Sequence, residues 1–220
     1  MRIELDFLAV LGWWPLLLAG LAWTVGLTAI STVFGVLIGI VCAWVRGNGP
    51  PLLRVLAGSY VELVRNTPFI VQLFFIFFGL PSLGLRLTPE VASLIAMTMN
   101  LGAYATEIIR AGIEAAPKGQ FEAAASLALN RRQAFIHVIL PPALRKVWPA
   151  LVSQIIIVML GSAVCGQIAT EELSHAAGLI QSRNFRAFES FIVATLLYLL
   201  LAILLRRLLN WAGPRLLFGR

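Results

Sequence analysis

The sequence predicts an all-α membrane protein with about five transmembrane helices and its N-terminus outside the cytoplasm. Hydrophobic residues make up 60% of the 220 residues, and charged residues only 12%, well below the share in soluble domains. Apolar runs recur along the chain, and each bilayer crossing needs about 20 residues. The basic residues also fall mainly on one side of the predicted spans. These three observations exclude a soluble domain held by a single anchor.

The first apolar run extends from Phe7 to Val45 and is nearly twice as long as one bilayer crossing. The Trp13-Trp14-Pro15 cluster divides it, because tryptophan favours the membrane interface and proline favours the first turn of a helix. We therefore expect an N-terminal lead-in segment at residues 1–20, partly interfacial from Phe7, and a first span over about residues 21–45. Glycines in this span allow close helix packing, or simply reflect membrane-helix composition: Gly26, Gly35 and Gly39.

The second predicted span is interrupted. A turn at residues 46–51 precedes a helix that begins near Leu52, and the Asn66-Thr67-Pro68 sequence breaks this helix because proline disfavours helical geometry in the residue before it. Glu62 and Arg65 are three residues apart and could pair on one helix face. The apolar stretch from residue 69 to residue 80 continues beyond the break.

The third predicted span, about residues 90–109, carries a polar face. Asn100, Tyr104 and Glu107 follow the i, i+4, i+7 spacing of one helical face. Polar groups are costly in hydrocarbon and usually face a bundle interior or a cavity. They therefore indicate either a substrate path or satisfied hydrogen bonds between helices, and Glu107 could also simply pair with Arg110.

Two further spans complete the chain, at about residues 147–168 and 190–209, with a polar loop at residues 170–189 between them. The fourth span offers polar or small positions that could line the same path: Gln154, Gly161 and Ser162. His175 in the loop has no second metal ligand at a helical spacing, so we expect a solvated histidine there. Cys42 and Cys165 lie in apolar segments and suggest neither a disulfide nor a metal site.

The basic residues give the orientation of these spans. With the N-terminus outside, one side receives 13 of them, namely Arg46, Arg54, Arg65, Arg110, Lys118, Arg131, Arg132, Arg145, Lys146, Arg206, Arg207, Arg215 and Arg220. The other side receives Arg2, Arg86, Arg183 and Arg186. Lys and Arg concentrate on the cytoplasmic side of membrane proteins, so the net charge of +7 indicates topology and not nucleic-acid binding.

The longest stretch without a continuous apolar run reads GQFEAAASLALNRRQAFIHVILPP, from Gly119 to Pro142, and falls on the cytoplasmic side. Its Ala- and Leu-rich part from residue 121 to residue 129 favours a helix without interruption, residues 133–140 continue it, and Pro141-Pro142 closes the stretch. A charged helix between two spans suits the docking of a soluble partner.

This stretch resembles the EAA loop of ABC importer permeases in Glu122-Ala123-Ala124, Leu127, Phe135, Ile139, Leu140 and Pro141. The flanking sequences GAYATEIIRAGIEAAPKGQ and YVELVRNTPFIVQLFF are similar to the polar amino acid uptake branch of that family. The resemblance implies the type I importer permease fold, with a permease domain at residues 21–210, a coupling region at about 115–140 and a cytoplasmic tail at 211–220. The family usually has Gly where this chain has Ala128, which bears on how sharply the coupling helix turns.

The resemblance also implies a function. The chain is expected to be the permease subunit of an ATP-driven importer of polar amino acids in a bacterial inner membrane. Its expected partners are an ATP-binding subunit that holds ATP and magnesium, a second permease subunit, an extracytoplasmic solute-binding protein, the amino acid and the lipid bilayer. The residues expected to couple to the ATP-binding subunit are Gly119, Glu122, Ala123, Ala124, Ala128 and Pro141.

The chain itself lacks the phosphate loop G-x-x-x-x-G-K-[ST], a nucleophile motif and a metal-ligand cluster, so we expect no enzyme activity, catalytic residue or cofactor in it. An ATP-independent secondary transporter or channel is the main alternative, although such proteins often carry internal repeats and none is evident. A membrane scaffold without transport activity is a third.

One departure from the family concerns the substrate. Permeases of this branch commonly have Lys-Asp followed by Thr or Ser near the outer end of the fourth span, whereas this chain has Leu160-Gly161-Ser162. Without that carboxylate we expect no strong selection for a cationic side chain within the membrane.

Overall fold

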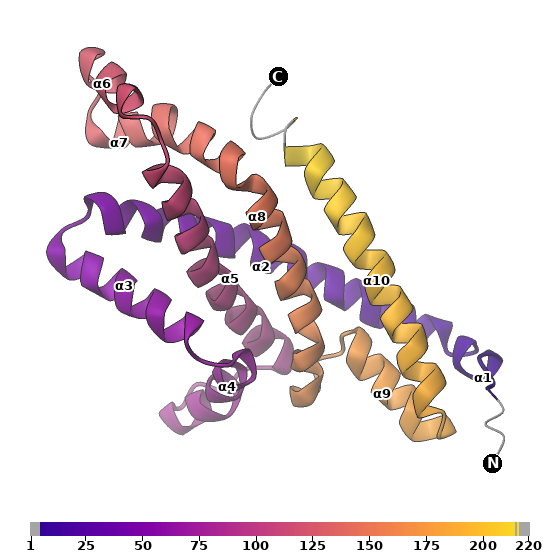
Figure 1. The fold of residues 1–220 in the computed structure, drawn as a ribbon. Coiled ribbons are helices and arrows are strands. Elements are labelled where there is room, and N and C mark those ends of the chain that lie inside the picture. The colour runs from indigo at the N-terminus through magenta and orange to yellow at the C-terminus, as the bar shows by residue number, and fades with distance from the viewer. Residues whose placement is uncertain (1–4, 214, 216–220) are drawn as a thin grey trace. The chain divides into compact units, whose positions relative to one another are not determined.

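The computed structural model describes residues 5–213 and 215, and this part of the chain folds into helices without a β-strand (Figure 1). Helices suit a chain in lipid, because every backbone N–H and C=O then finds its partner within its own segment. The predicted all-α class is confirmed. Parts of the expected lead-in segment (residues 1–4) and tail (residues 214 and 216–220) lie outside the described residues.

In chain order the elements are α1 (Leu8–Leu11), α2 (Trp14–Asn48), α3 (Pro51–Arg65), α4 (Phe69–Phe74), the π-helix η1 (Phe75–Gly79), the 3-10 helix η2 (Leu80–Leu83), α5 (Pro89–Glu114), α6 (Lys118–Ser126), α7 (Arg131–Ala134), the π-helix η3 (Phe135–Ile139), α8 (Leu140–Gly161), the 3-10 helix η4 (Ser162–Ile168), α9 (Leu173–Asn184) and α10 (Ala187–Ala212). They form two compact units. The outer unit, as we name it, comprises residues 5–31, 68–98 and 157–204, and the coupling unit comprises the remaining described residues.

Three helical runs are long and apolar enough to cross a membrane: Trp14–Asn48, Arg131–Ile168 and Ala187–Ala212. The bent pair Pro51–Arg65 and Phe69–Leu83 meets the same criterion together, as a broken span or a re-entrant loop, with a bend of 112° at the interruption that the sequence predicts. Helix α5 is also long enough at 26 residues, but it carries more polar side chains. By length and composition, the described residues therefore give three of the five expected spans, or four if the bent pair is counted as one.

The predicted division of the first apolar run is wrong. Helix α2 is one continuous element of 35 residues that begins at Trp14, so no helix boundary separates Gly20 from Leu21. The lead-in helix is only the four residues of α1. Pro15 explains the difference, because a proline in the first turn starts a helix without removing a hydrogen bond that the helix needs.

Helix α9 replaces much of the polar loop expected at residues 170–189. Leu173, Ala176, Ala177 and Ile180 are buried, and their i, i+3, i+4, i+7 spacing forms one apolar face. That face packs with Val10 and other residues into the core of the outer unit. Two of these four residues are alanines, so the hydrophobic periodicity that would indicate a buried helix is weak in the sequence.

Glu172 is a fully buried carboxylate at the start of α9. Its side chain accepts hydrogen bonds from the backbone N–H groups of Ser174 (2.9 Å) and His175 (2.7 Å), which caps the helix. The hydroxyl of Tyr198 on α10 donates a third. Burial raises the pKa of this carboxyl, and the hydrogen bonds only partly offset that effect.

Close packing between α2 and α5 organises the core of the coupling unit. An added Cβ at Gly35 would lie 2.9 Å from Leu101, and one at Gly39 would lie 2.7 Å from Ala105. Both positions therefore need glycine for the close approach of the two helices. An added Cβ at Gly26, in contrast, would meet no atom within 4 Å, so of the two alternatives for Gly26 this chain favours ordinary membrane-helix composition.

The segment between α5 and α8 is not the uninterrupted helix that its composition predicts. Helix α6 ends at Ser126, and the chain turns at Ala128, which has a left-handed φ of 53°. Asn130 then caps α7 by a reciprocal pair of hydrogen bonds with Gln133. The turn thus forms with alanine at the position where the family usually has glycine.

Pro141 does not close this segment, as was expected, but lies within the 38-residue helical run from Arg131 to Ile168. The π-helix η3 immediately precedes α8. Its looser hydrogen-bond pattern and the first turn of α8 tolerate prolines that donate no N–H bond.

The left-handed alanine generates a stability prediction. A left-handed conformation costs an L-residue roughly 1–2 kcal/mol, and glycine avoids this cost. Part of the gain is lost because glycine has more conformational entropy in the unfolded state. Ala128→Gly should therefore raise the free energy of unfolding by about 0.5–1 kcal/mol, whereas Ala123→Gly within α6 should lower it by a similar amount. Thermal unfolding of the two purified variants measures both changes in stability. If both substitutions stabilise the protein, or both destabilise it, the proposed strain at Ala128 is contradicted.

The buried carboxyl generates a pH prediction. Because the folded-state pKa of Glu172 lies above its unfolded value, its stabilisation is complete below the unfolded pKa of about 4.3 and is lost as pH rises through the folded pKa. Glu172→Gln keeps a capping oxygen but cannot titrate. The unfolding temperature should therefore fall less for this variant than for the wild type between acidic and mildly alkaline pH. Parallel curves would show that Glu172 does not titrate there.

Candidate functional site

The residues expected to couple to a partner lie mostly on the surface of the segment between α5 and α8. Gly119, Glu122 and Ala123 on α6 are exposed, as are Ala128 in the turn and Pro141 at the start of α8. Ala124 is the exception at 2% exposure. Ala124 lies on the buried side of α6, whereas the neighbouring residues Glu122 and Ala123 are exposed.

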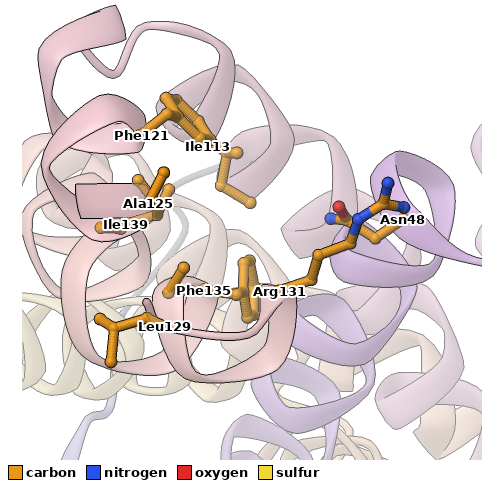
Figure 2. A pocket seen from close by; sticks show the side chains of 10 residues that line it. Asn48, Ile113, Phe121, Ala125, Leu129, Arg131, Phe135 and Ile139 are labelled. Atoms are coloured by element: carbon orange, nitrogen blue, oxygen red, sulfur yellow. The ribbon is translucent and has the colours of Figure 1, made fainter. Parts of the chain in front are cut away.

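The inner side of α6 borders a cavity of about 290 Å³ (Figure 2). Its wall is mostly apolar and includes Ile113, Phe121, Ala125, Leu129, Phe135 and Ile139. Figure 2 shows the Arg131 side chain extending toward Asn48, so the polar groups of the wall gather at one end. The segment therefore rests on the helices beneath it through an incompletely filled apolar contact.

Phe135 holds the segment in place. It is 7% exposed and borders three cavities of the coupling unit, and its ring packs at 6.5 Å from the ring of Trp44 on α2. Ile139, one turn later in η3, is 2% exposed. A displacement of α6 would thus press on η3, and η3 continues directly into α8.

Beside this segment, Glu107 binds three guanidinium groups. Arg46 from α2 contacts one carboxylate oxygen, while Arg110 at 2.9 Å and Arg65 at 3.8 Å contact the other. The guanidinium of Arg65 also lies over the ring of Tyr104, at 5.4 Å from its centroid. The predicted Glu107–Arg110 pair is confirmed, but Arg65 contacts Glu107 and not Glu62.

This arrangement changes what Glu107 can do. A carboxylate is costly to place near hydrocarbon, and three guanidiniums from α2, α3 and α5 compensate it. Its oxygens are therefore engaged within the protein. Glu107 ties three segments of the coupling unit together and is a poor receptor for a cationic solute.

The other residues expected on a substrate path fall in both units. Asn100, Tyr104 and Gln154 belong to the coupling unit, where Gln154 is 9% exposed. Gly161 and Ser162 belong to the outer unit, at the junction of α8 and η4. The Ser162 hydroxyl is buried and donates to the carbonyl of Met159, whereas an added Cβ at Gly161 would meet no atom within 4 Å.

Sequence reasoning missed several residues of this site. It treated Arg46 only as a topology marker and proposed Glu62 as the partner of Arg65, although both arginines contact Glu107. The sequence analysis gave no role to Asn48, which lines the cavity, or to Trp44, whose ring packs against Phe135. The available signal was that Arg46, Arg65 and Arg110 each lie near the end of a predicted helical segment.

The described residues contain no group of three or more His, Cys, Asp or Glu side chains that could hold a metal ion. Cys42 and Cys165 are free thiols. The exposed helix α6 borders an apolar cavity and contacts η3, which continues into the long helix α8. This arrangement suits the transmission of a mechanical displacement.

Comparison with known proteins agrees with this geometry. The binding-protein-dependent transport system inner membrane component family matches residues 35–218. The chain is 36% identical over 193 residues to the L-cystine transport system permease protein TcyB of Bacillus subtilis (strain 168), which covers 87% of this chain and 82% of the relative. It is 32% identical over 204 residues to the arginine transport system permease protein ArtQ of the same organism, covering 92% and 93%.

Solved structures give the same result. The structure of an amino acid ABC transporter with histidines has a TM-score of 0.87 at 35% identity and covers 97% of this chain and 100% of its own. The inward-facing MetNI methionine ABC transporter has a TM-score of 0.70 at 23% identity, over 92% and 94% of the two chains, a likeness of fold. The chain therefore belongs to the family of binding-protein-dependent transport system inner membrane components and has the type I ABC importer permease fold.

Proposed function

We propose that this chain is the transmembrane permease subunit of an ATP-driven importer of polar amino acids, coupled through α6 to a separate ATP-binding subunit. The observation that carries the proposal is the exposed Glu122-Ala123 surface on a short cytoplasmic helix whose inner side rests on Phe135. Relatives named as permeases for cystine, glutamine and arginine support the amino acid class. The family membership disfavours the ATP-independent alternative.

The proposed coupling is mechanical. An ATP-binding subunit can drive the permease only through different affinities for its two states. Glu122 has no ion-pair partner among the described residues, so its carboxylate is available to a basic group of that subunit. Movement of α6 would reach α8 through Ala124, Phe135 and Ile139, which are all buried. A second permease subunit and an external solute-binding protein complete the proposed assembly.

The proposed substrate is a polar amino acid without selection for a basic side chain inside the membrane. Glu107 is held by three guanidiniums and so offers little free negative charge. Gly161 brings no carboxylate to the junction of α8 and η4. Asn100, Gln154 and Ser162 remain as neutral hydrogen-bonding groups on the proposed path, so discrimination among amino acids would rest largely with the solute-binding protein.

Charge reversal at Glu122 tests the docking. Glu122→Lys should reduce substrate transport about ten-fold or more while the ATP-binding subunit still hydrolyses ATP, because a repulsive contact replaces a charge-assisted one. Glu122→Gln is the matched variant and should lose less. Uptake and ATPase activity of the reconstituted complex measure the two effects, and normal transport by Glu122→Lys would rule out this contact.

A carboxylate at residue 161 tests the substrate assignment. Gly161→Asp has room for its side chain and should shift substrate-stimulated ATPase activity toward arginine or lysine by at least about five-fold, or about 1 kcal/mol. Gly161→Asn controls for size and should not cause the shift. A wild type that already transports only basic amino acids, with Gly161→Asp unchanged, would contradict the proposed path.

A further inference from the structure

A second cavity of the coupling unit is lined by arginines. It measures about 270 Å³ and lies where the end of α2, the start of α3 and the end of α5 meet. Its polar wall consists of Arg46, Asn48, Arg54, Arg110 and Glu114. Ligand pockets commonly measure about 300–1,000 Å³, so this volume suits a head group and not a whole lipid or nucleotide.

The charges of this wall do not balance. Glu107 and Glu114 compensate Arg46 and Arg110, to which they are ion-paired. Arg65 also contacts Glu107, so four guanidiniums stand against these two carboxylates, and Arg54 is the one without a carboxylate partner in the described part of the chain. Among the described residues Arg54 has no carboxylate partner and donates only to the carbonyl of Gly49, at 3.2 Å.

The cavity also has room beside these groups. Gly47 and Gly58 lie on its wall, and an added Cβ at either position would meet no atom within 4 Å. Gly58 is one helical turn after Arg54 on α3 and so shares its face. An anion between Arg54 and Asn48 would therefore meet a guanidinium and an amide donor without displacing a side chain.

Helix α3 presents an apolar surface beside the cavity. Leu52, Val55, Leu56 and Leu63 are all more than half exposed, at 70%, 64%, 56% and 65%. An exposed apolar surface of this kind suits contact with acyl chains. The cytoplasmic leaflet also carries anionic lipids, and basic pockets between helices on that side bind their head groups.

We propose that this arginine-lined cavity binds the phosphate group of an anionic phospholipid of the cytoplasmic leaflet, with Arg54 as its principal ligand and the acyl chains along α3. The lipid would bridge α2, α3 and α5 beside the Glu107 cluster. This proposal stands independently of the substrate and of the ATP-binding subunit.

Native mass spectrometry of the purified full chain, with any subunits that co-purify, tests the proposal. Dioleoylphosphatidylglycerol, dioleoylphosphatidylcholine and inorganic phosphate serve as probes. Arg54→Gln removes the uncompensated charge, and Gly58→Leu fills the cavity without changing any charge. Arg145→Gln is the matched control, because Arg145 is also an exposed cytoplasmic arginine of the coupling unit without an ion pair among the described residues.

The wild type should bind phosphatidylglycerol at least about five-fold more tightly than phosphatidylcholine, as one unpaired guanidinium predicts. Arg54→Gln and Gly58→Leu should abolish that preference, and Arg145→Gln should keep it. Equal affinity for the two lipids, or equal behaviour of Arg54→Gln and Arg145→Gln, would overturn the site. Displacement of phosphatidylglycerol by millimolar inorganic phosphate would overturn the lipid assignment and show a free phosphate site.

Discussion

Hydrocarbon offers no partner for a backbone N–H or C=O group, and this constraint governs where the chain can depart from regular helix. The departures that matter most are few. At the interruption after α3, the side chains of Asn66 and Thr67 donate hydrogen bonds to the backbone carbonyls of Glu62 and Leu63. After the turn at Ala128, the side chain of Asn130 caps helix α7. Each break therefore brings side chains that satisfy the freed backbone groups. The segment between α5 and α8 turns at a place where the sequence predicts the cytoplasmic side of the membrane.

The partly buried Glu107 and the fully buried Glu172 show two ways to offset the cost of removing a carboxylate from water. Glu107 is compensated by charge, with guanidiniums from α2, α3 and α5. Glu172 accepts hydrogen bonds from neutral donors, namely backbone N–H groups and the Tyr198 hydroxyl, and these only partly offset the rise in its pKa that burial causes. The first joins segments of the coupling unit and the second fixes α9 in the outer unit. In both, the carboxylate holds structure and is not a free recognition group.

Sequence reasoning predicted the helical class, the interruption at residues 66–68 and the family, because these follow from composition, proline chemistry and a family pattern. It failed where tertiary packing decides. Nothing local in residues 121–129 indicates that Ala128 adopts a positive φ, since alanine there favours a continuing helix. The buried face of α9 is partly alanine and so resembled a loop. The three partners of Glu107 come from residues 46, 65 and 110, and only the fold shows that these meet.

The central claim is that α6 is the surface through which an ATP-binding subunit moves this permease. Photocrosslinking in native membranes tests it most directly, with a benzoylphenylalanine placed at Ala123 on the exposed face of α6 or at Leu83, an exposed residue of η2 predicted to lie outside the cytoplasm. The account predicts a crosslink to the ATP-binding subunit from residue 123, stronger or weaker with its nucleotide state, and none from residue 83. Absence of that crosslink at residue 123, in an assembly that still transports, would contradict it.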